Sequence, residues 1–181
     1  MKTHIVLLRG INVSGKNIIK MSVLKEALQD TGFSDVETYI QSGNILLSSS
    51  LESNAEISSK VERVIKDTFG LNVPALVLAP GSLKKYVANN PFLSVAENTK
   101  ALLICFLWDK PNHDSISFVE SKYFPPDDIR IDGKIIYLYF PEGSAKTKFT
   151  GAFLESKLKT RATIRNWRTC QTLIKMAVEA K

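Results

Sequence analysis

Residues Gly10–Asn17 have the most suggestive pattern of residue types in this chain. They read Gly-Ile-Asn-Val-Ser-Gly-Lys-Asn and meet the pattern G-x-x-x-x-G-K of a phosphate-binding P-loop. In such a loop, backbone N–H groups and the lysine hold phosphate oxygens, and a following Ser or Thr holds a magnesium ion. Asn17 stands at that last position here, so the stretch lacks the hydroxyl that would bind the metal.

Apolar periodicity and turn residues predict the elements that surround this stretch. The order strand, helix, strand, strand, helix, strand is that of a split β-α-β unit, in which the third strand lies between the first two. Ser22 is the expected N-cap of the first helix, and Gly70 is expected to end the second. The predicted ranges are strands at His4–Arg9, Val36–Ile40, Ile45–Leu47 and Pro74–Leu78, and helices near Lys20–Thr31 and Asn54–Phe69.

This topology predicts a binding rim at one edge of the sheet. The end of the first strand and the short hairpin Gln41–Asn44 after the second strand are expected to meet there. Cations, amides and flexible glycines in such loops suit a phosphate, a carboxylate or the edge of a nucleobase. The alternative is that Asn and Gly only satisfy turn geometry, and that the cations are solvated or ion-paired. The candidate ligand-binding residues of the rim are Arg9, Asn12, Lys16, Asn17, Gln41, Ser42 and Asn44.

The same element order disfavours a nucleotide-hydrolysing P-loop. A P-loop helix begins at the lysine, whereas Ile18–Met21 separate Lys16 from the predicted helix. The following strands form a hairpin, and the sheets of P-loop enzymes are mainly parallel. The apolar run 101–109 does end in an acid, Asp109, as a metal-binding second motif would, but such an ending is common.

The second half repeats the order of elements without repeating the residues. Asp132-Gly133 between two apolar runs is a type I′ hairpin pattern. The fold class predicted is α+β, with two tandem ferredoxin-like modules, 1–93 and 94–181, and a C-terminal helix. The predicted ranges are a connecting helix at Ser82–Ala88, strands at Ala101–Trp108, Ile129–Ile131, Lys134–Phe140 and Ala162–Ile164, and helices near His113–Lys122, Lys148–Leu158 and Asn166–Ala180.

Basic residues concentrate near the C-terminus. Residues 146–175 contain eight Lys or Arg and one acid, Glu155, in a chain of net charge +6. Such a block suggests an anionic partner, although a solvated helix face is the commoner explanation. If Thr163 is the N-cap of the last helix, Arg165 heads a basic stripe opposite Trp167, which is expected in the core. Arg165 and Asn166 are therefore further candidate ligand-binding residues.

Several function classes lack the residues they need. Cys105 and Cys170 are isolated, as expected of reduced core residues in a cytoplasmic protein. His4 and His113 have no metal-ligand spacing around them and form no recognisable catalytic set, so no metal and no cofactor is expected. The N-terminus lacks a secretion signal, and no apolar run approaches the length of a membrane span. The oligomeric state is left open.

Four segments resemble motifs of the bacterial family known as domain of unknown function 1697, and the resemblance covers nearly the whole chain. It implies two tandem ferredoxin-like (α-β plait) modules and no activity. Ser14 stands where many members have Gly. The segments are Leu7–Val13 with Gly15–Asn17, Thr38–Asn44, Asn90–Phe92 and Ala162–Thr169.

Three functions remain as hypotheses. The first is a cytoplasmic protein that binds a small anionic or nucleotide-like ligand at the rim, to which the basic C-terminal stretch could add. The second is sequence-tolerant binding of nucleic acid through that basic stretch. The third is an enzyme that uses Lys16 or Arg9 to stabilise charge in a transition state, although no general base can be named.

Overall fold

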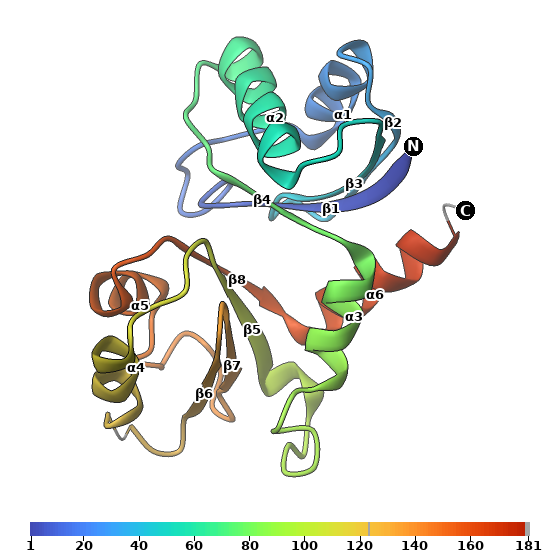
Figure 1. The fold of residues 1–181 in the computed structure, drawn as a ribbon. Coiled ribbons are helices and arrows are strands. Elements are labelled where there is room, and N and C mark those ends of the chain that lie inside the picture. Colours follow the sequence, from blue (N-terminus) through green and yellow to red (C-terminus); the bar gives the residue numbers. More distant parts are fainter. Residues whose placement is uncertain (123, 180–181) are drawn as a thin grey trace. The chain divides into compact units, whose positions relative to one another are not determined.

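The computed structural model describes residues 1–122 and 124–179 and divides into two compact units. The first unit comprises residues 1–84 and 172–181, and the second comprises residues 85–171. The strands, labelled in Figure 1, are β1 (Lys2–Leu8), β2 (Ser34–Tyr39), β3 (Asn44–Ser49), β4 (Ala75–Leu78), β5 (Leu102–Leu107), β6 (Asp128–Asp132), β7 (Ile135–Tyr139) and β8 (Ala162–Asn166). The helices are α1 (Met21–Asp30), α2 (Asn54–Phe69), α3 (Pro80–Ala88), α4 (His113–Glu120), α5 (Gly151–Leu158) and α6 (Trp167–Glu179). The expected end of the last helix, Ala180, lies outside the described residues.

The sheet of the first unit has the strand order β2-β3-β1-β4, and all neighbouring strands are antiparallel. β3 therefore lies between β1 and β2, which run in the same direction. Helices α1 and α2 lie side by side on one face of this sheet (Figure 1). Alternate residues of the strands, such as Val6, Ile45 and Val77, pack with these helices in one apolar core.

Helix α2 begins and ends where the sequence predicts, because all its determinants are local. The Ser53 hydroxyl accepts the Glu56 N–H at 3.1 Å, and the Glu56 carboxylate accepts the Ser53 N–H, forming a capping box. The stripe of Ile57, Val61, Val64 and Ile65 is buried. Gly70 ends the helix in the left-handed conformation at a φ of 70°.

Two predicted N-caps are wrong. Ser22 lies inside α1, whose N-cap position is Lys20 and has no side-chain cap. Thr163 lies within β8, and α6 begins at Trp167. Asn166 takes the capping role, because its Oδ1 accepts the Arg168 N–H at 2.9 Å.

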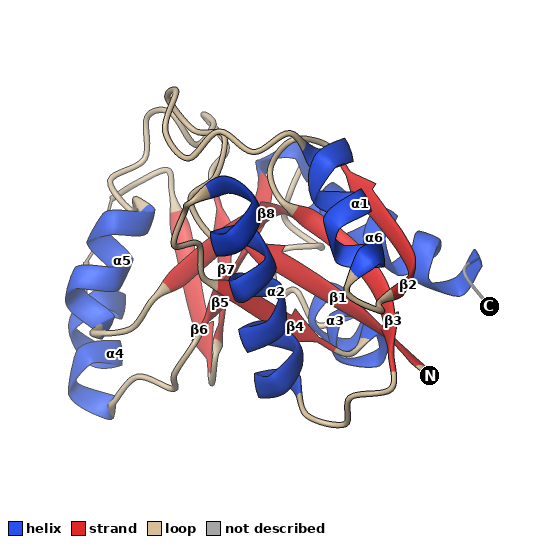
Figure 2. Ribbon diagram, turned by 90° about the horizontal axis from the view of Figure 1, so that it is seen from above, coloured by secondary structure: helices blue, strands red, loops and turns tan. Residues whose placement is uncertain are grey.

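The sheet of the second unit has the same arrangement, in the strand order β6-β7-β5-β8 with antiparallel neighbours. Helices α4 and α5 lie side by side (Figure 2) and share an apolar core with the sheet. The β6–β7 turn differs from the type I′ prediction. Asp132 pairs with Ile135, so Gly133 and Lys134 are the central residues, and only Gly133 has a positive φ, of 60°. A positive φ at the first central residue alone is typical of a type II′ turn.

The indole of Trp167 is buried, as predicted, and its Nε1–H donates to the carbonyl of Val87 at 3.1 Å. Both residues belong to the second unit.

None of the helices in the described ranges combines the length and the apolar character needed to cross a bilayer.

His4 is a buried histidine on β1, opposite Leu47, with 6% of its surface exposed. Neither ring nitrogen has a hydrogen-bond partner in the described part of the chain. Burial, with a smaller contribution from the charge of Lys2, lowers the pKa of His4 below its ordinary value. The folded protein therefore holds this imidazole in its neutral form at neutral pH.

We predict that His4 makes the protein sensitive to acid. The unfolded chain takes up a proton on His4 near pH 6.5, whereas the folded chain does so only at lower pH, so stability falls as the pH drops below about 6.5. In urea denaturation at a series of pH values, His4→Leu is expected to lose less stability between pH 7 and 5. The difference cannot exceed about 1.4 kcal/mol per pH unit for one proton. The exposed His113, changed to Leu, is the control and is expected to follow the wild type. Equal pH slopes for wild type and His4→Leu would contradict the prediction.

Candidate functional site

The side chain of Asn12 joins the two loops of the predicted rim. Its Nδ2–H₂ group donates to the carbonyl of Gln41 at 2.8 Å and to the carbonyl of Ile19 at 3.0 Å. Its Oδ1 accepts the Ile19 N–H at 2.9 Å, and its backbone N–H donates to the carbonyl of Asn17 at 3.2 Å. The loop after β1 and the turn between β2 and β3 therefore lie at one edge of the sheet. We call residues 9–19 and 40–43 the first rim.

Backbone contacts close the same edge. The Leu8 N–H donates to the carbonyl of Gly43 at 2.8 Å, and the Arg9 N–H donates to that of Pro74, which precedes β4, at 2.9 Å. Leu8 and Ile11 leave no room for a side chain at Gly43, because an added Cβ would lie 2.7 Å from the Cβ of Leu8 and 2.9 Å from the Cδ1 of Ile11. Glycine is required here both by this approach and by a φ of 78°.

The segment that resembles a P-loop contains a tight hairpin turn. The Lys16 N–H donates to the carbonyl of Val13 at 2.9 Å, and these two residues form an isolated antiparallel bridge. The central residues Ser14 and Gly15 have φ values of 49° and 73°, as in a type I′ turn. Helix α1 begins only at Met21, so no helix N-terminus follows the lysine directly. This geometry agrees with the sequence argument against a nucleotide-hydrolysing P-loop.

Three of the predicted ligand-binding amides hold the rim together. Asn12 does so as described, and the Nδ2–H₂ group of Asn17 donates to the carbonyl of Gly10 at 2.9 Å. Asn44 is fully buried, and its Nδ2–H₂ group donates to the carbonyl of Tyr39 at 3.0 Å and to Ser42 Oγ at 2.9 Å. Their physical role is therefore to position the loops.

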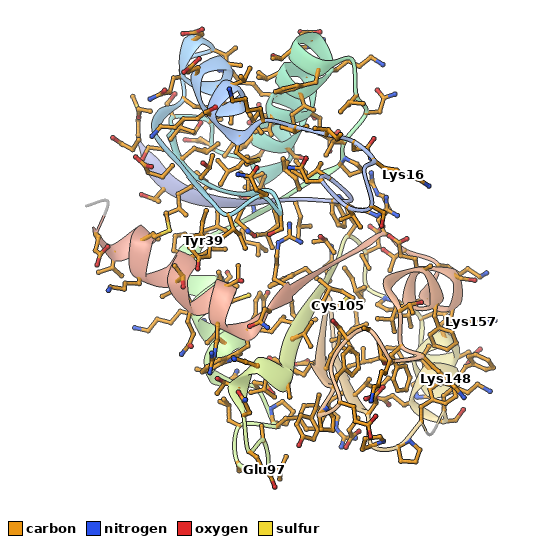
Figure 3. The ribbon with its side chains drawn as sticks, turned by 180° about the vertical axis from the view of Figure 1, so that it is seen from behind. Lys16, Tyr39, Glu97, Cys105, Lys148 and Lys157 are labelled. Atoms are coloured by element: carbon orange, nitrogen blue, oxygen red, sulfur yellow. The ribbon has the colours of Figure 1, made fainter. Side chains whose placement is uncertain are left out.

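Other groups of the rim face solvent. Lys16 and Gln41 are exposed, and Figure 3 shows the Lys16 side chain extending outward from its loop. The N–H groups of Ser14 and Gly15 donate to no acceptor in the described ranges. Arg9 and Ser42 are half-buried. The loop segments 9–19 and 40–43 contain no Asp or Glu.

The rim also exposes aliphatic side chains that the sequence analysis did not select. Val13, Ile18 and Ile40 are 60%, 70% and 50% exposed. Each is next in the chain to Asn12 or to a residue that Asn12 contacts. Ile40 also has a φ of 51°, which is a strained conformation for a β-branched residue. In the sequence, only the neighbouring Asn, Ser and Gly residues indicate that these three apolar residues lie in exposed loops.

Arg165 and Asn166 lie in the second unit, on β8. Arg165 is buried, and its Nη1 donates to Thr163 Oγ1 at 2.8 Å and to the carbonyl of Ile164 at 2.9 Å. Desolvation lowers the pKa of its guanidinium to about 10. Asn166 caps α6. Both therefore have structural roles, and neither heads a basic stripe on the last helix.

The cysteines have no nucleophilic character. Both are free and buried. Burial raises the pKa of the Cys105 thiol well above its ordinary value and that of Cys170 to about 12. No group of three or more His, Cys, Asp and Glu side chains suited to a metal occurs among the residues that the structure describes.

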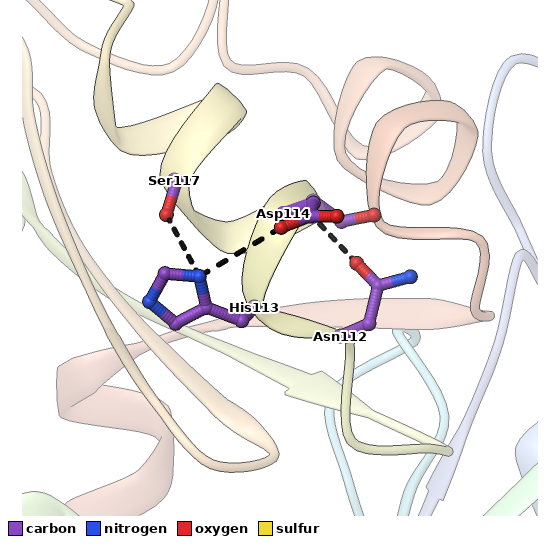
Figure 4. A network of polar contacts seen from close by, with 5 residues as sticks. Asn112, His113, Asp114 and Ser117 are labelled. Atoms are coloured by element: carbon purple, nitrogen blue, oxygen red, sulfur yellow. Dashed lines mark hydrogen bonds and ion pairs between the residues drawn. The ribbon is translucent and has the colours of Figure 1, made fainter.

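A serine, a histidine and an aspartate lie together at the start of α4 (Figure 4), where Asn112 caps the helix. His113 Nδ1 lies 3.5 Å from Ser117 Oγ and 3.9 Å from Asp114 Oδ1. A catalytic triad needs the serine and the acid on different ring nitrogens, and it needs protection from water. Here both approach Nδ1, and the His113 and Asp114 side chains are fully exposed, so the set cannot relay a proton from serine to histidine.

Residues 1–137 match the model of a protein family described as protein of unknown function (DUF1697). The chain belongs to the DUF1697 family. It is also similar to a solved structure, the conserved bacterial protein SP0830 from Streptococcus pneumoniae, at 26% sequence identity and a TM-score of 0.75. That similarity covers 97% of this chain and 98% of the other. No curated protein matches the chain. The family is thus one of unknown function, and the structure shows a mixed α+β fold with two four-stranded antiparallel sheets.

We predict that Gly43 and Gly10 respond differently to the same change. Gly10→Ala places a Cβ where no atom lies within 4 Å. Its only cost is the strain of an alanine at a left-handed φ, which is expected to lower the free energy of unfolding by about 1 kcal/mol. Gly43→Ala adds overlap with Leu8 and Ile11, which is expected to cost about 1–3 kcal/mol more. Urea denaturation of both variants measures the difference. Equal losses of stability would show that the close approach at Gly43 relaxes easily.

We also predict that Asn12 holds Ile19 in place. Asn12→Gly tolerates the φ of 53° but removes the side-chain hydrogen bonds, with an expected loss of about 1–3 kcal/mol. The Ile19 N–H loses its acceptor, so its hydrogen exchange should accelerate in NMR measurements. Asn17→Gly is the matched control, because Asn17 has a similar φ of 47° and does not contact Ile19 through its side chain. Unchanged exchange at Ile19 in Asn12→Gly would refute this role.

Proposed function

We propose that this protein is a cytoplasmic binding protein that recognises a small anionic or nucleotide-like ligand at the first rim. The observation that carries the proposal is the hydrogen bond from Asn12 to the carbonyl of Gln41, because it brings the Lys16 loop and the Gln41 turn to one place. In this proposal the chain consists of two ferredoxin-like modules, residues 1–93 and 94–181.

The ligand is anionic because the polar groups of the rim that face solvent are mainly donors. The Lys16 ammonium and the N–H groups of Ser14 and Gly15 are available to an acceptor. Such groups suit phosphate or carboxylate oxygens, and adjacent backbone N–H groups at a left-handed turn are a common anion-binding arrangement. The exposed amide of Gln41 offers both a donor and an acceptor, as the edge of a nucleobase does.

The remaining candidates support these groups. Asn12, Asn17 and Asn44 keep the loops in position through their hydrogen bonds to backbone carbonyls. Because those amides are already engaged within the protein, binding requires no rearrangement of them. Arg9 and Ser42 lie beneath the exposed layer and add charge and a hydroxyl from the same edge. A pre-formed site of this kind avoids the entropic cost of ordering its loops on binding.

The test is a thermal-shift screen of wild type and Lys16→Ala against nucleotides, phosphosugars and carboxylates. A ligand at about 100 times its dissociation constant stabilises the protein by about 2.7 kcal/mol, which corresponds to several degrees in a chain of this size. Loss of a hydrogen bond to a charged group costs about 1.5–3 kcal/mol, so Lys16→Ala is expected to lose about tenfold or more in affinity.

Lys84→Ala is the matched control for the loss of one positive charge. Lys84 is exposed on α3 in the same unit and is far in sequence from either loop. It is expected to respond as the wild type does. If Lys16→Ala and Lys84→Ala respond equally to every ligand that stabilises the wild type, or if no ligand does, the first rim is not the binding site.

A further inference from the structure

The sheet of the second unit has an edge built by the same two backbone contacts as the first rim. The Leu107 N–H donates to the carbonyl of Lys134 at 2.9 Å, and the Trp108 N–H donates to that of Arg161 at 3.1 Å. These correspond to the contacts of Leu8 and Arg9 in the first unit, at the end of the first strand of each sheet. We call residues 108–110, 133–134 and 159–161 the second rim; all belong to the second unit.

The second rim carries a stacked pair of flat groups. The guanidinium carbon of Arg161 lies 5.2 Å from the centre of the Trp108 ring, within cation–π range. Trp108 is half-buried, and Arg161 is exposed. A planar guanidinium that lies on an indole offers a surface on which a nucleobase can stack.

Further cations surround this pair. The Lys134 ammonium donates to the backbone carbonyl of Trp108 at 2.6 Å, so its charge is held at the residue that carries the ring. Lys110 and Lys159 are exposed in the adjoining loops. The acids near this edge are Asp109, Asp132 and Glu155, and the carboxylate of Glu155 accepts the Ala162 N–H at 2.8 Å. The first is engaged by Thr160, whose Oγ1 accepts the Asp109 N–H at 3.0 Å and lies 3.4 Å from Asp109 Oδ2. Four cations therefore face three acids around one aromatic platform.

We propose that the second rim binds single-stranded nucleic acid, with a base stacked on the Trp108–Arg161 pair and phosphates beside Lys134 and its neighbouring lysines. Stacking platforms combined with cationic grooves are how proteins bind single strands without reading their sequence. A free phosphate would need the cations but not the ring. A lipid surface would need exposed aliphatic side chains, and the strongly exposed apolar residues of the described ranges lie outside this rim. The proposal involves a different unit and different residues from the first rim, so either can fail alone.

The geometry also distinguishes this rim from the rest of the basic stretch. Lys146 is ion-paired with Glu142 at 3.2 Å, and Lys148 lies over the Phe124 ring at 5.2 Å. Arg165 is buried. Lys159 and Arg161, unlike these three cations, belong to the second rim.

The test is fluorescence anisotropy of a labelled oligothymidylate of about 12 nucleotides with the full chain at low salt. Wild type is expected to bind in the micromolar range, with an affinity that falls steeply as salt is added. Arg161→Lys keeps the charge but removes the planar group, so binding is expected to weaken at least about fivefold. Lys134→Ala is expected to weaken binding. It is also expected to reduce the slope of log affinity against log salt concentration by about one, as the loss of one phosphate contact would.

Two controls make the result decisive. Lys146→Ala removes a charge from the same unit outside the rim, and Lys84→Ala removes one from the first unit outside either rim; both are expected to stay within about twofold of wild type. Trp108→Phe is expected to retain more affinity than Trp108→Leu even where urea denaturation shows the two variants to be equally stable, because only the aromatic ring can stack on a base. The proposal is overturned if Arg161→Lys binds like the wild type, if Lys146→Ala weakens binding as much, or if no anisotropy change occurs up to about 100 μM protein.

Discussion

The side chain of Asn12 is the contact on which the first rim depends. Residues 9–19 form neither strand nor helix, so their backbone groups need partners from elsewhere. One carboxamide supplies partners for two of them, the N–H and the carbonyl of Ile19, and also for the carbonyl of Gln41 in the other loop. It thereby holds three segments in position: the residues that precede α1, the turn at Lys16, and the turn between β2 and β3. It also explains how α1 starts without a capping side chain, because Ile19, just before the helix, is already held.

The two units use one backbone design for two chemistries. In each, the end of the first strand donates one N–H to the turn between the second and third strands and the next N–H to the segment that precedes the fourth. At the first edge these segments carry amides, aliphatic residues and Lys16, whereas at the second they carry Trp108, Arg161 and Lys134. The backbone thus places loops together, and the residues in those loops decide what each edge can bind.

The sequence predicts best where the determinants are close in the chain. The bounds of α2 follow from its capping box, its apolar stripe and Gly70, all within its own length. Ser22 and Thr163 are good capping residues that do not cap, because the start of each helix is set by contacts that local propensity does not contain. The β6–β7 turn was recognised by its glycine, but its type depends on strand register, which places Gly133 rather than Asp132 at the first central position.

The sequence by itself determined the order of elements, the division of apolar and polar positions, and the meeting of the Lys16 loop with the Gln41 turn. These follow from periodicity and from the constraint that a split crossover puts on two strand ends. Only the tertiary structure decided which polar groups face solvent. Asn12 and Asn44 turn inward to backbone carbonyls, Arg165 is buried, and Val13, Ile18 and Ile40 are exposed. The direction of a polar side chain depends on which unsatisfied backbone group folding brings near it, and for Asn12 that partner lies 29 residues away.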